Sequence, residues 1–417
     1  MHFFKTSFFL KQKRKKMILY LFLFIAIITL MIFLKKKGSF EKNNKHLKSD
    51  RIKSKSDLIG FKPHYSRKLC EEEELYAFRP DRELISLKLG QRKLLFSELE
   101  YYTKILQPGE EALIVYAGSA SGSHNPPLLE LFNHCEFHFY DSNPFSAKLA
   151  RFTNDFKKAE AFPLDNRYKK GSAENSKNLK LFHQYFTEKD AQNYIPSKRS
   201  KKLLFLSDIR TSGLEDGVES DLQLQQQWCD IIKPDHAMLK MRLRWIPGKT
   251  LYYSGKLYTQ PRVGPKSTEL RLWTNCKDKI EYDNDTYNNQ CYFFQKYHRN
   301  AFHDFSTIIK EKKTDTPEIK QLKLKLKTEI KTLHDKIKGL CHCNDCWSEI
   351  KIITKFLLKF RTGHTIIEFF NYLDGPNALD IPPHNLLTSE SDINKRIALL
   401  EKKTIEYNRE YKEGRVL

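Results

Sequence analysis

The sequence has too few cysteines for a disulfide framework. Its 417 residues contain eight, and most of them stand alone, as reduced thiols do. Only Cys341, Cys343 and Cys346 cluster, in the run CHCNDCW, where His342 could join them as zinc ligands. Zinc ligands usually arrive as two separated pairs, and the sequence has no second pair. We therefore expect reduced thiols of a cytosolic protein, a packed helix start at this run, and no metal.

Acidic residues are scarce relative to basic ones. The chain has 51 Asp and Glu against 73 Lys and Arg, a formal net charge of +22. Such a surplus indicates a polyanionic partner, either nucleic acid or an anionic membrane surface. Because 40% of the residues are hydrophobic, wholesale disorder is excluded, and the length allows one large or two modest domains. Residues 1–68 hold 18 basic and three acidic side chains, so +15 of the surplus belongs to this end.

One uncharged apolar run, MILYLFLFIAIITLMIFL at residues 17–34, is near the lower length limit for crossing a bilayer. It follows a basic segment at 1–16, and no small-residue cleavage motif comes after it. We therefore expect an uncleaved transmembrane anchor rather than a signal peptide. Residues 35–68, rich in Lys, Ser and Asn, are typical of a polar tether. Their twelve basic residues, against six before the run, favour a cytosolic C-terminal part.

Apolar periodicity predicts a globular α/β domain from about residue 69. An amphipathic helix at 91–106 precedes a continuous apolar strand at 112–117, which runs into the glycine turn GSASGSH. A second strand at 136–140 ends on Asp141, whose carboxylate could accept hydrogen bonds from both hydroxyls of a ribose. This order of elements indicates a nucleoside-binding domain, against the alternative of an ordinary strand-to-helix turn.

The glycine turn lacks the spacing G-x-G-x-x-G, which disfavours NAD as the ligand. S-adenosylmethionine needs no pyrophosphate cradle and fits the turn better. Three of the later side chains, Asp208, Lys240 and Glu269, lie within predicted strands. Lys240 stands among apolar residues, either as a snorkelling side chain or as a desolvated amine suited to act as a base. The remaining predicted elements are strands at 201–210, 236–245 and 267–274 and a helix at 221–232.

Five segments match a known family in order and spacing: GQRKLLFSELEYYTKIL, VYAGSASGSH, LLFLSDIR, HAMLKMRLRW and QPRVGPKSTELRLW. Over residues 75–300 the chain resembles the poxvirus-type cap-specific mRNA nucleoside-2′-O-methyltransferases, which double as the small, regulatory subunit of poly(A) polymerase. The resemblance implies a large DNA virus as the source. It implies a Rossmann-like, S-adenosylmethionine-dependent methyltransferase sheet with flanking helices at 69–305, facing the host cytoplasm or held at a virion membrane.

The activity that this resemblance implies is methyl transfer to the ribose 2′-hydroxyl of the first transcribed nucleotide of capped mRNA. The implied partners are capped mRNA and a poly(A) polymerase catalytic subunit. The family's catalytic tetrad falls on Lys93, Asp208, Lys240 and Glu269. A ribose hydroxyl is a poor nucleophile, so methyl transfer to it requires alignment of the hydroxyl and removal of its proton. The resemblance assigns the base to Lys240, whose amine must be neutral to accept that proton, and the mechanism implies no metal.

The same resemblance places the cofactor-binding positions around the glycine turn. Asp208 corresponds to the methionine end of the ligand, and Phe186 to a contact with the adenine. Where the family has an arginine two residues after the ribose-binding acid, this sequence has Asn143. The full set of implied cofactor positions is Gln91, Tyr116, Gly118, Gly122, Asp141, Phe186 and Asp208.

Cap recognition requires aromatic faces, because 7-methylguanine is a cationic base that such faces can sandwich. Trp245 and Tyr76 fall on stacking positions of the family, with packing in the core as the alternative for Trp245. Two departures bear on cap selectivity: Lys266 replaces a cap-contacting tyrosine, and Asn288 replaces an acidic residue that would recognise the guanine edge. The implied cap- and transcript-contacting positions are Tyr76, Arg242, Trp245, Ser267, Thr268 and Glu269.

After residue 305 the composition changes to a Lys-rich helical extension, 306–417. Apolar residues recur at spacings of three and four from Ile319 to Leu340, which predicts one stripe along a long helix. We expect the stripe to pack on the domain, with pairing to a partner helix as the alternative. Two other functions stay open beside catalysis: a non-catalytic RNA-binding regulatory subunit of a viral poly(A) polymerase, and a membrane scaffold with a relic fold.

Overall fold

The computed structural model describes residues 66–71, 89–119, 121–146, 149, 178–212, 215–264, 266–337, 340–373, 394–395, 397–402 and 404–406. The chain divides into two units, Met1–Asp57 and Leu58–Leu417, and all of the described residues belong to the second. The predicted anchor at 17–34 therefore lies outside the described residues. Within the described part, none of the helices is long and apolar enough to span a membrane.

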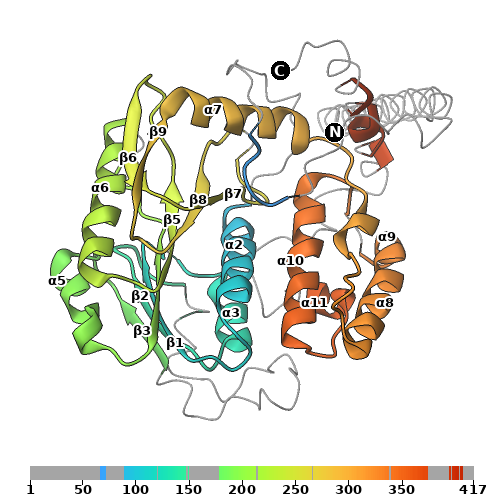
Figure 1. Cartoon of the computed structure of the whole chain (residues 1–417), viewed down its shortest axis with the longest axis horizontal. Coiled ribbons are helices and arrows are strands. Elements are labelled where there is room, and N and C mark those ends of the chain that lie inside the picture. The colour runs from blue at the N-terminus through green and yellow to red at the C-terminus, as the bar shows by residue number, and fades with distance from the viewer. Residues whose placement is uncertain are drawn as a thin grey trace, which may run out of the picture. The chain divides into compact units, whose positions relative to one another are not determined.

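A seven-stranded sheet lies at the centre of the second unit, in the order β3-β2-β1-β4-β5-β8-β7 (Figure 1). Neighbouring strands from β3 to β5 pair in parallel, whereas β8 is antiparallel to both of its neighbours. A separate antiparallel pair joins β6 to β9. The strands are β1 (Ala112–Ala117), β2 (Glu136–Tyr140), β3 (Leu179–Phe182), β4 (Lys202–Ser207), β5 (His236–Met241), β6 (Lys249–Tyr253), β7 (Lys256–Tyr258), β8 (Leu270–Thr274) and β9 (Lys279–Asp283).

Strand order reverses between β1 and β4, because the chain runs outward from β1 to β3 and then returns to the other side of β1. In open α/β sheets, ligands bind beyond the carboxyl ends of the strands at this kind of reversal. Ala117 pairs with Tyr140 on one side and with Ser207 on the other, so the three strands end at one level. The residues that follow them therefore meet at a single edge of the sheet.

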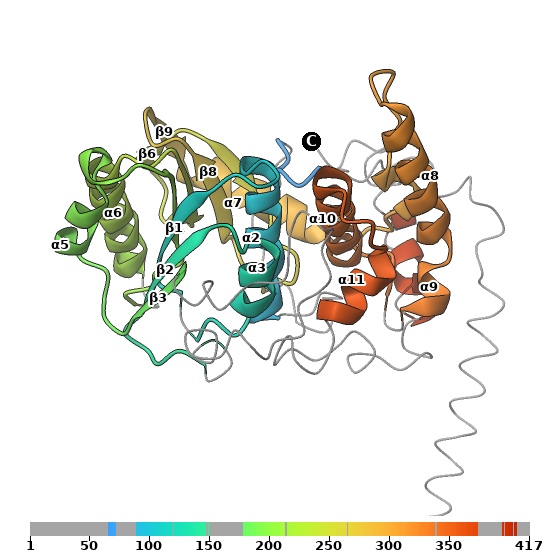
Figure 2. The same ribbon diagram turned by 90° about the horizontal axis from the view of Figure 1, so that it is seen from below.

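Helices cover both faces of the sheet, as Figures 1 and 2 show from two directions. On one face lies α6, where Trp228 contacts Phe205 of β4 edge to face at 6.5 Å between centroids. On the other face lies α2, where Tyr101 contacts Trp273 of β8 at 5.3 Å. The helices that flank the sheet are α2 (Gly90–Ile105), α3 (Asn125–Leu131), α5 (Glu188–Ala191), α6 (Glu215–Ile232) and α7 (Asn284–Phe293).

The helices of the extension pack on the sheet domain, as predicted. The predicted long helix is interrupted at Thr332, but its apolar stripe is buried from Leu326 onward, and Leu326 and Ile330 join the same core as α2. Aromatic contacts from Phe132 to Phe356 and Phe360, at 5.9 and 5.6 Å, join α10 to the sheet domain. These helices are α8 (Pro317–Lys331), α9 (Leu333–Lys336), α10 (Asn344–Phe360) and α11 (Ile366–Leu373).

Several boundaries differ from the prediction. The strand predicted at 201–210 ends at Ser207, so Asp208 lies just beyond it, and the helix predicted at 221–232 begins at Glu215. The strand predicted at 236–245 ends at Met241, and the strand predicted at 267–274 begins at Leu270, so Glu269 lies immediately before it. The predicted tether extended to residue 68, yet Arg67 is buried in the domain. Its guanidinium contacts Glu100 at 3.2 Å and donates to the Thr259 carbonyl at 2.6 Å. The hydrophobic period and the polarity of a segment identify a helix, strand or tether. The residue at which the segment ends also depends on contacts with residues distant in the sequence.

Candidate active site

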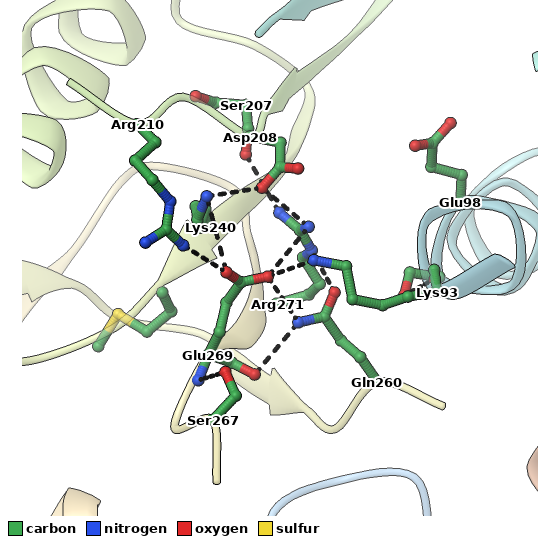
Figure 3. Close-up of polar contacts among 12 residues, drawn as sticks. Lys93, Glu98, Ser207, Asp208, Arg210, Lys240, Gln260, Ser267, Glu269 and Arg271 are labelled. Atoms are coloured by element: carbon green, nitrogen blue, oxygen red, sulfur yellow. Dashed lines mark hydrogen bonds and ion pairs between the residues drawn. The ribbon is translucent and has the colours of Figure 1, made fainter. Parts of the chain in front are cut away.

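The four predicted catalytic side chains converge, although they come from four different segments of the chain (Figure 3). Lys93 lies near the start of α2, and Asp208 follows the last residue of β4. Lys240 lies on β5, and Glu269 directly precedes β8, which pairs with β5. Lys240 lies near the carboxyl end of β5 and next to both carboxylates. The tetrad therefore lies at the carboxyl edge of the sheet, beside the reversal of strand order.

Glu269 is the centre of this cluster. Its Oε1 accepts a hydrogen bond from Lys93 Nζ at 2.6 Å, and its Oε2 accepts one from Arg210 Nη2 at 3.2 Å. Lys240 Nζ lies 3.6 Å from Glu269 Oε2 and 3.1 Å from Asp208 Oδ1. The Lys240 amine is thus held between two carboxylates, and Glu269 connects it to the Lys93 amine.

Two further buried groups, which the sequence prediction missed, hold the carboxylates in place. Arg271, only 2% exposed, donates from Nη2 to Asp208 Oδ1 at 3.0 Å and lies 3.5 Å from Glu269 Oε1. Gln260 donates from Nε2 to Glu269 Oε1 at 3.1 Å and accepts a bond from Arg271 Nε at 2.8 Å. In a strand, side chains two positions apart point to the same face. Because the strand predicted at 267–274 contains both Glu269 and Arg271, their spacing could have identified Arg271.

The cluster keeps both carboxyl groups ionised. Burial by itself raises the pKa of Glu269, but the charges of Lys93, Lys240 and Arg271 outweigh it and hold this pKa well below its usual range. Burial also raises the pKa of Asp208, and here Arg271, Lys240 and Lys93 outweigh it, so the net shift is downward. The Arg271 pKa is raised, because its two carboxylate partners outweigh burial. Two carboxylates that stay ionised therefore hold the amines of the site in place.

The glycine turn lies directly beside the tetrad. Gly118 has φ +79°, and a Cβ there would lie 2.9 Å from the backbone nitrogen of Ile209 and 3.0 Å from the carbonyl carbon of Asp208. Gly122 also has a positive φ, +60°, and a Cβ there would meet Leu149. Glycine at 118 lets the end of β1 and the residues after β4 approach closely. The predicted cofactor turn thus lies directly against the backbone that carries Asp208.

Gln91, near the start of α2, is oriented by a buried network. Its Oε1 accepts a hydrogen bond from Ser123 Oγ at 3.0 Å and lies 2.8 Å from His124 Nδ1. The other nitrogen of His124 lies 2.8 Å from Glu98 Oε1, and both of these side chains are fully buried. With its oxygen occupied in this way, the Gln91 amide can offer its nitrogen as a donor to a ligand.

Asp141 follows β2 at the same edge and is itself oriented by Asn143. Its Oδ1 accepts hydrogen bonds from the backbone nitrogen of Asn143 at 2.7 Å and from Asn143 Nδ2 at 3.1 Å. The asparagine, which stands where the resemblance implies an arginine, thus positions the acid that was predicted to bind ribose.

Two of the predicted cofactor residues are part of the core. Tyr116 on β1 is 1% exposed and contacts Phe139 edge to face at 5.9 Å. Phe186 is 6% exposed and packs against Tyr140 at 4.8 Å and Trp228 at 5.1 Å. The structure therefore places the Phe186 ring in an aromatic cluster behind the sheet edge rather than on an open surface.

The positions predicted to contact cap and transcript lie on the loop after β5 and the segment before β8. Arg242 forms an ion pair with Glu215 at the start of α6. The other oxygen of Glu215 accepts the backbone N–H of Trp245 at 2.8 Å, and the Trp245 side chain is half-buried. One acid thus fixes both predicted RNA contacts. Tyr76 lies outside the described residues.

The segment before β8 is held by hydrogen bonds to its main chain. Ser267 Oγ accepts the backbone N–H of Glu269 at 3.1 Å, and the Thr268 carbonyl accepts the hydroxyl of Tyr287 at 2.6 Å. Asn288, which replaces an acid of the family, is buried and donates to the carbonyl of Arg244 at 2.9 Å. Asn288 therefore supports the loop that carries Trp245, and Lys266, in the segment before β8, is partly exposed.

The three clustered cysteines lie apart from this site, at the start of α10. None of the eight cysteines, all of which lie in the described part of the chain, forms a disulfide. The Sγ atoms of Cys341, Cys343 and Cys346 lie within 4.8 Å of one another, and all three residues are buried. The predicted packed helix start is present, since Cys343 is the N-cap of α10.

Comparison with known proteins places the chain among RNA-processing subunits. The sequence model of the poly A polymerase regulatory subunit family matches residues 62–313, more than half of the chain. A solved structure of bluetongue virus VP4, described as a multifunctional RNA-capping production line, aligns with 13% identity and a TM-score of 0.34. That alignment covers 58% of this chain but spans only 37% of VP4, and so low a similarity carries no weight for fold or function. No curated protein sequence matches the chain.

Proposed function

Because the chain belongs to the poly(A) polymerase regulatory subunit family, we propose that it is an S-adenosylmethionine-dependent RNA methyltransferase. Its substrate would be the ribose 2′-hydroxyl of the first transcribed nucleotide of capped mRNA. The observation that carries the proposal is the convergence of two lysine amines and two carboxylates at the edge of the sheet. The amines belong to Lys93 and Lys240, and the carboxylates to Asp208 and Glu269.

The chemistry assigns each member of the tetrad a role. S-adenosylmethionine, when bound, supplies an electrophilic methyl group on a positively charged sulfur. Lys240 Nζ, in its neutral form, takes the proton of the attacking 2′-hydroxyl. Asp208 and Glu269 fix that amine in position, and Lys93 and Arg271 hold Glu269 in turn. Preorganised charges of this kind need no rearrangement when the proton moves.

The residues at the sheet edge fit this cofactor. Asp141 offers carboxylate oxygens at the end of β2, as a ribose diol requires. The turn at Gly118 brings main chain, without a side chain, to the reversal of strand order. Gln91 is oriented so that its amide nitrogen can donate to the methionine carboxylate. The absence of a pyrophosphate cradle favours S-adenosylmethionine over a dinucleotide.

A methyl-transfer assay tests this proposal directly. The full chain, purified in detergent, should transfer labelled methyl to capped RNA and far less to the same RNA without a cap. Lys240→Met keeps most of the side-chain volume but removes the amine, so transfer should fall by at least about 100-fold, a typical loss for a general base. Lys327→Met, which removes a partly exposed amine on α8 that pairs with Glu311, is the matched control. Wild-type transfer by Lys240→Met would overturn the mechanism.

The family match itself favours a second candidate function, that of a regulatory subunit of poly(A) polymerase. Such a subunit would bind RNA and the catalytic subunit without needing the tetrad. Tail lengths made by the polymerase with wild type and with Lys240→Met separate the two activities. Equal stimulation by both proteins would indicate a regulatory role independent of methyl transfer, and no stimulation by either would remove this candidate.

We propose further that residues 17–34 attach the protein to a membrane, with the methyltransferase domain on the cytoplasmic side or at a virion membrane. The support is sequence alone: an uncharged run of apolar residues between basic flanks. Deleting residues 17–34 should release the protein from the membrane fraction of expressing cells. Retention of the deleted protein at the membrane would contradict the assignment.

A further inference from the structure

We propose that Cys341, Cys343 and Cys346 bind a single zinc ion, a site that is independent of the proposed methyl transfer. All three side chains are buried, and their Sγ atoms lie within 4.8 Å of one another. Among the described residues, these three form the one group of possible metal-ligating side chains that close together. The cluster lies in the extension, beyond residues 62–313 that match the family.

The sulfur spacing fits one tetrahedral ion. With Zn–S bonds of about 2.3 Å, two thiolates on a tetrahedral zinc are about 3.8 Å apart. Cys341 Sγ and Cys346 Sγ are 3.7 Å apart. A disulfide would require about 2.05 Å, and an iron–sulfur cluster would hold its cysteines further apart than a single ion does. Three thiolates and an exogenous ligand such as water would complete the coordination.

Two features of the surroundings would stabilise thiolates once a metal displaces their protons. Cys343 is the N-cap of α10 and Cys346 lies in its first turn, where backbone N–H groups and the helix dipole stabilise anions. The Arg262 guanidinium donates to Cys346 Sγ at 3.4 Å. Thiolates are soft ligands that select zinc over hard cations such as magnesium or calcium. The absence of a second ligand pair in the sequence therefore does not exclude a metal, because folding brings all three thiols together.

The competing state is a cluster of neutral thiols. In that state Cys341 Sγ and Cys346 Sγ, which lie 3.7 Å apart, share a hydrogen bond. A divalent ion displaces such protons as it binds. The two states differ in metal content, which an experiment can measure directly.

A zinc ion here would connect the extension to the start of α2. The Arg262 carbonyl accepts the backbone N–H of Leu89, which is the N-cap of α2. The Leu89 carbonyl in turn accepts the N–H of Lys93. Arg262 has φ +62°, a strained conformation for a residue with a side chain, and its contacts with Glu349 and Cys346 hold it there. The metal would thus stabilise the geometry from which α2 presents Gln91 and Lys93.

Metal analysis of the full chain tests this inference. Protein purified in detergent, under reducing conditions and without chelator, should contain one zinc ion per chain by mass spectrometry of its elements. Cys343→Ser should lose the ion, whereas the control Cys135→Ser, which changes a buried thiol elsewhere, should keep it. No zinc in folded wild type, another metal in its place, or full zinc in Cys343→Ser would each overturn the assignment.

A second measurement covers the case in which Cys343→Ser fails to fold. Wild-type protein stripped of metal should take up one Co²⁺ per chain and develop the thiolate charge-transfer and d–d absorption of a tetrahedral sulfur site. Added zinc should abolish that absorption. Folded protein that binds cobalt without a thiolate band, or binds none, would refute the site.

Discussion

Arg271 Nη2 lies 3.0 Å from Asp208 Oδ1, so a fully buried guanidinium joins the end of β4 to β8 across the intervening strand β5. The same guanidinium lies 3.5 Å from Glu269 Oε1. Its partners are the two acids between which the Lys240 amine is held. Arg271 therefore positions both carboxylates without facing the solvent side of the site.

Arg271→Gln should lower methyl transfer by at least about tenfold, because loss of a preorganised charge typically costs a site that much or more. It should also change the pH profile. Arg271 is a main cause of the lowered pKa of Asp208 and contributes to that of Glu269. Without it both pKa values rise, so the acid limb of kcat/KM should move to higher pH. Arg199→Gln, which removes a mostly buried arginine paired with the half-exposed Asp235 outside the tetrad, should leave the limb in place.

Arg271→Gln should also make the folded protein less stable at acid pH. Carboxyl groups whose folded pKa is lowered stabilise the fold above their usual values, 3.8 for Asp208 and 4.5 for Glu269, and lose this effect as pH falls through the folded pKa. Wild type should therefore keep this contribution at pH 5, and Arg271→Gln should unfold at a higher pH in an acid titration followed by circular dichroism. Identical acid transitions would contradict the role assigned to Arg271.

Gly118→Ala should abolish cofactor binding and destabilise the protein. The added Cβ would lie 2.9 Å from the nitrogen of Ile209, in a backbone conformation with φ +79°. Gly109 has nearly the same φ, +77°, but nothing lies within 4 Å of its Cβ position. Gly109→Ala thus carries only the backbone strain, about 1 kcal/mol. Calorimetry with S-adenosylmethionine should show binding by Gly109→Ala and none by Gly118→Ala, and equal affinities would refute the cofactor turn.

The sequence predicted the central strands of the sheet better than the contacts that hold the tetrad in place. Strands at 112–117 and 136–140 were predicted with the bounds that the structure has, because buried parallel strands are continuous apolar runs closed by turn residues. Short, partly exposed strands such as β6 and β7 carry no such pattern and were not predicted. The tetrad came from the family resemblance, since contacts such as the one from Arg271 to Asp208 join residues that are 63 positions apart.

The junction between α2 and α10 illustrates the same limit. Two arginines, Arg92 and Arg262, share the carboxylate of Glu349 at 2.9 Å, and all three side chains are buried. In the sequence, these residues are ordinary charges on amphipathic segments. Only the fold shows that the extension supplies the acid and the domain supplies the arginines. A stripe of apolar residues could predict that the helices pack, but not which charges they bury.

Glu349→Gln should destabilise the protein strongly. Removing one partner leaves two buried guanidinium groups with less compensation, which typically costs about 3–5 kcal/mol. Glu281→Gln is the matched control, because Glu281 pairs with Lys249 at the surface and both are more than half exposed. An exposed pair contributes less than about 1 kcal/mol. Urea unfolding should separate the two variants, and a similar small loss for both would show that the α2–α10 junction tolerates an unpaired charge.

Trp245→Ala should weaken recognition of the cap and leave the cofactor site intact. The Trp245 ring is half-buried, and Glu215 holds its backbone N–H at 2.8 Å, so the side chain starts from a fixed point beside Arg242. Stacking of a base on an aromatic ring contributes about 1–3 kcal/mol, so the KM for capped RNA should rise roughly 5- to 150-fold while S-adenosylmethionine affinity stays constant. Tyr185→Ala, which removes a ring that is 77% exposed, should change neither quantity. If Trp245→Ala instead lowers the melting temperature without raising KM, the ring serves packing, and cap recognition must rest on other residues.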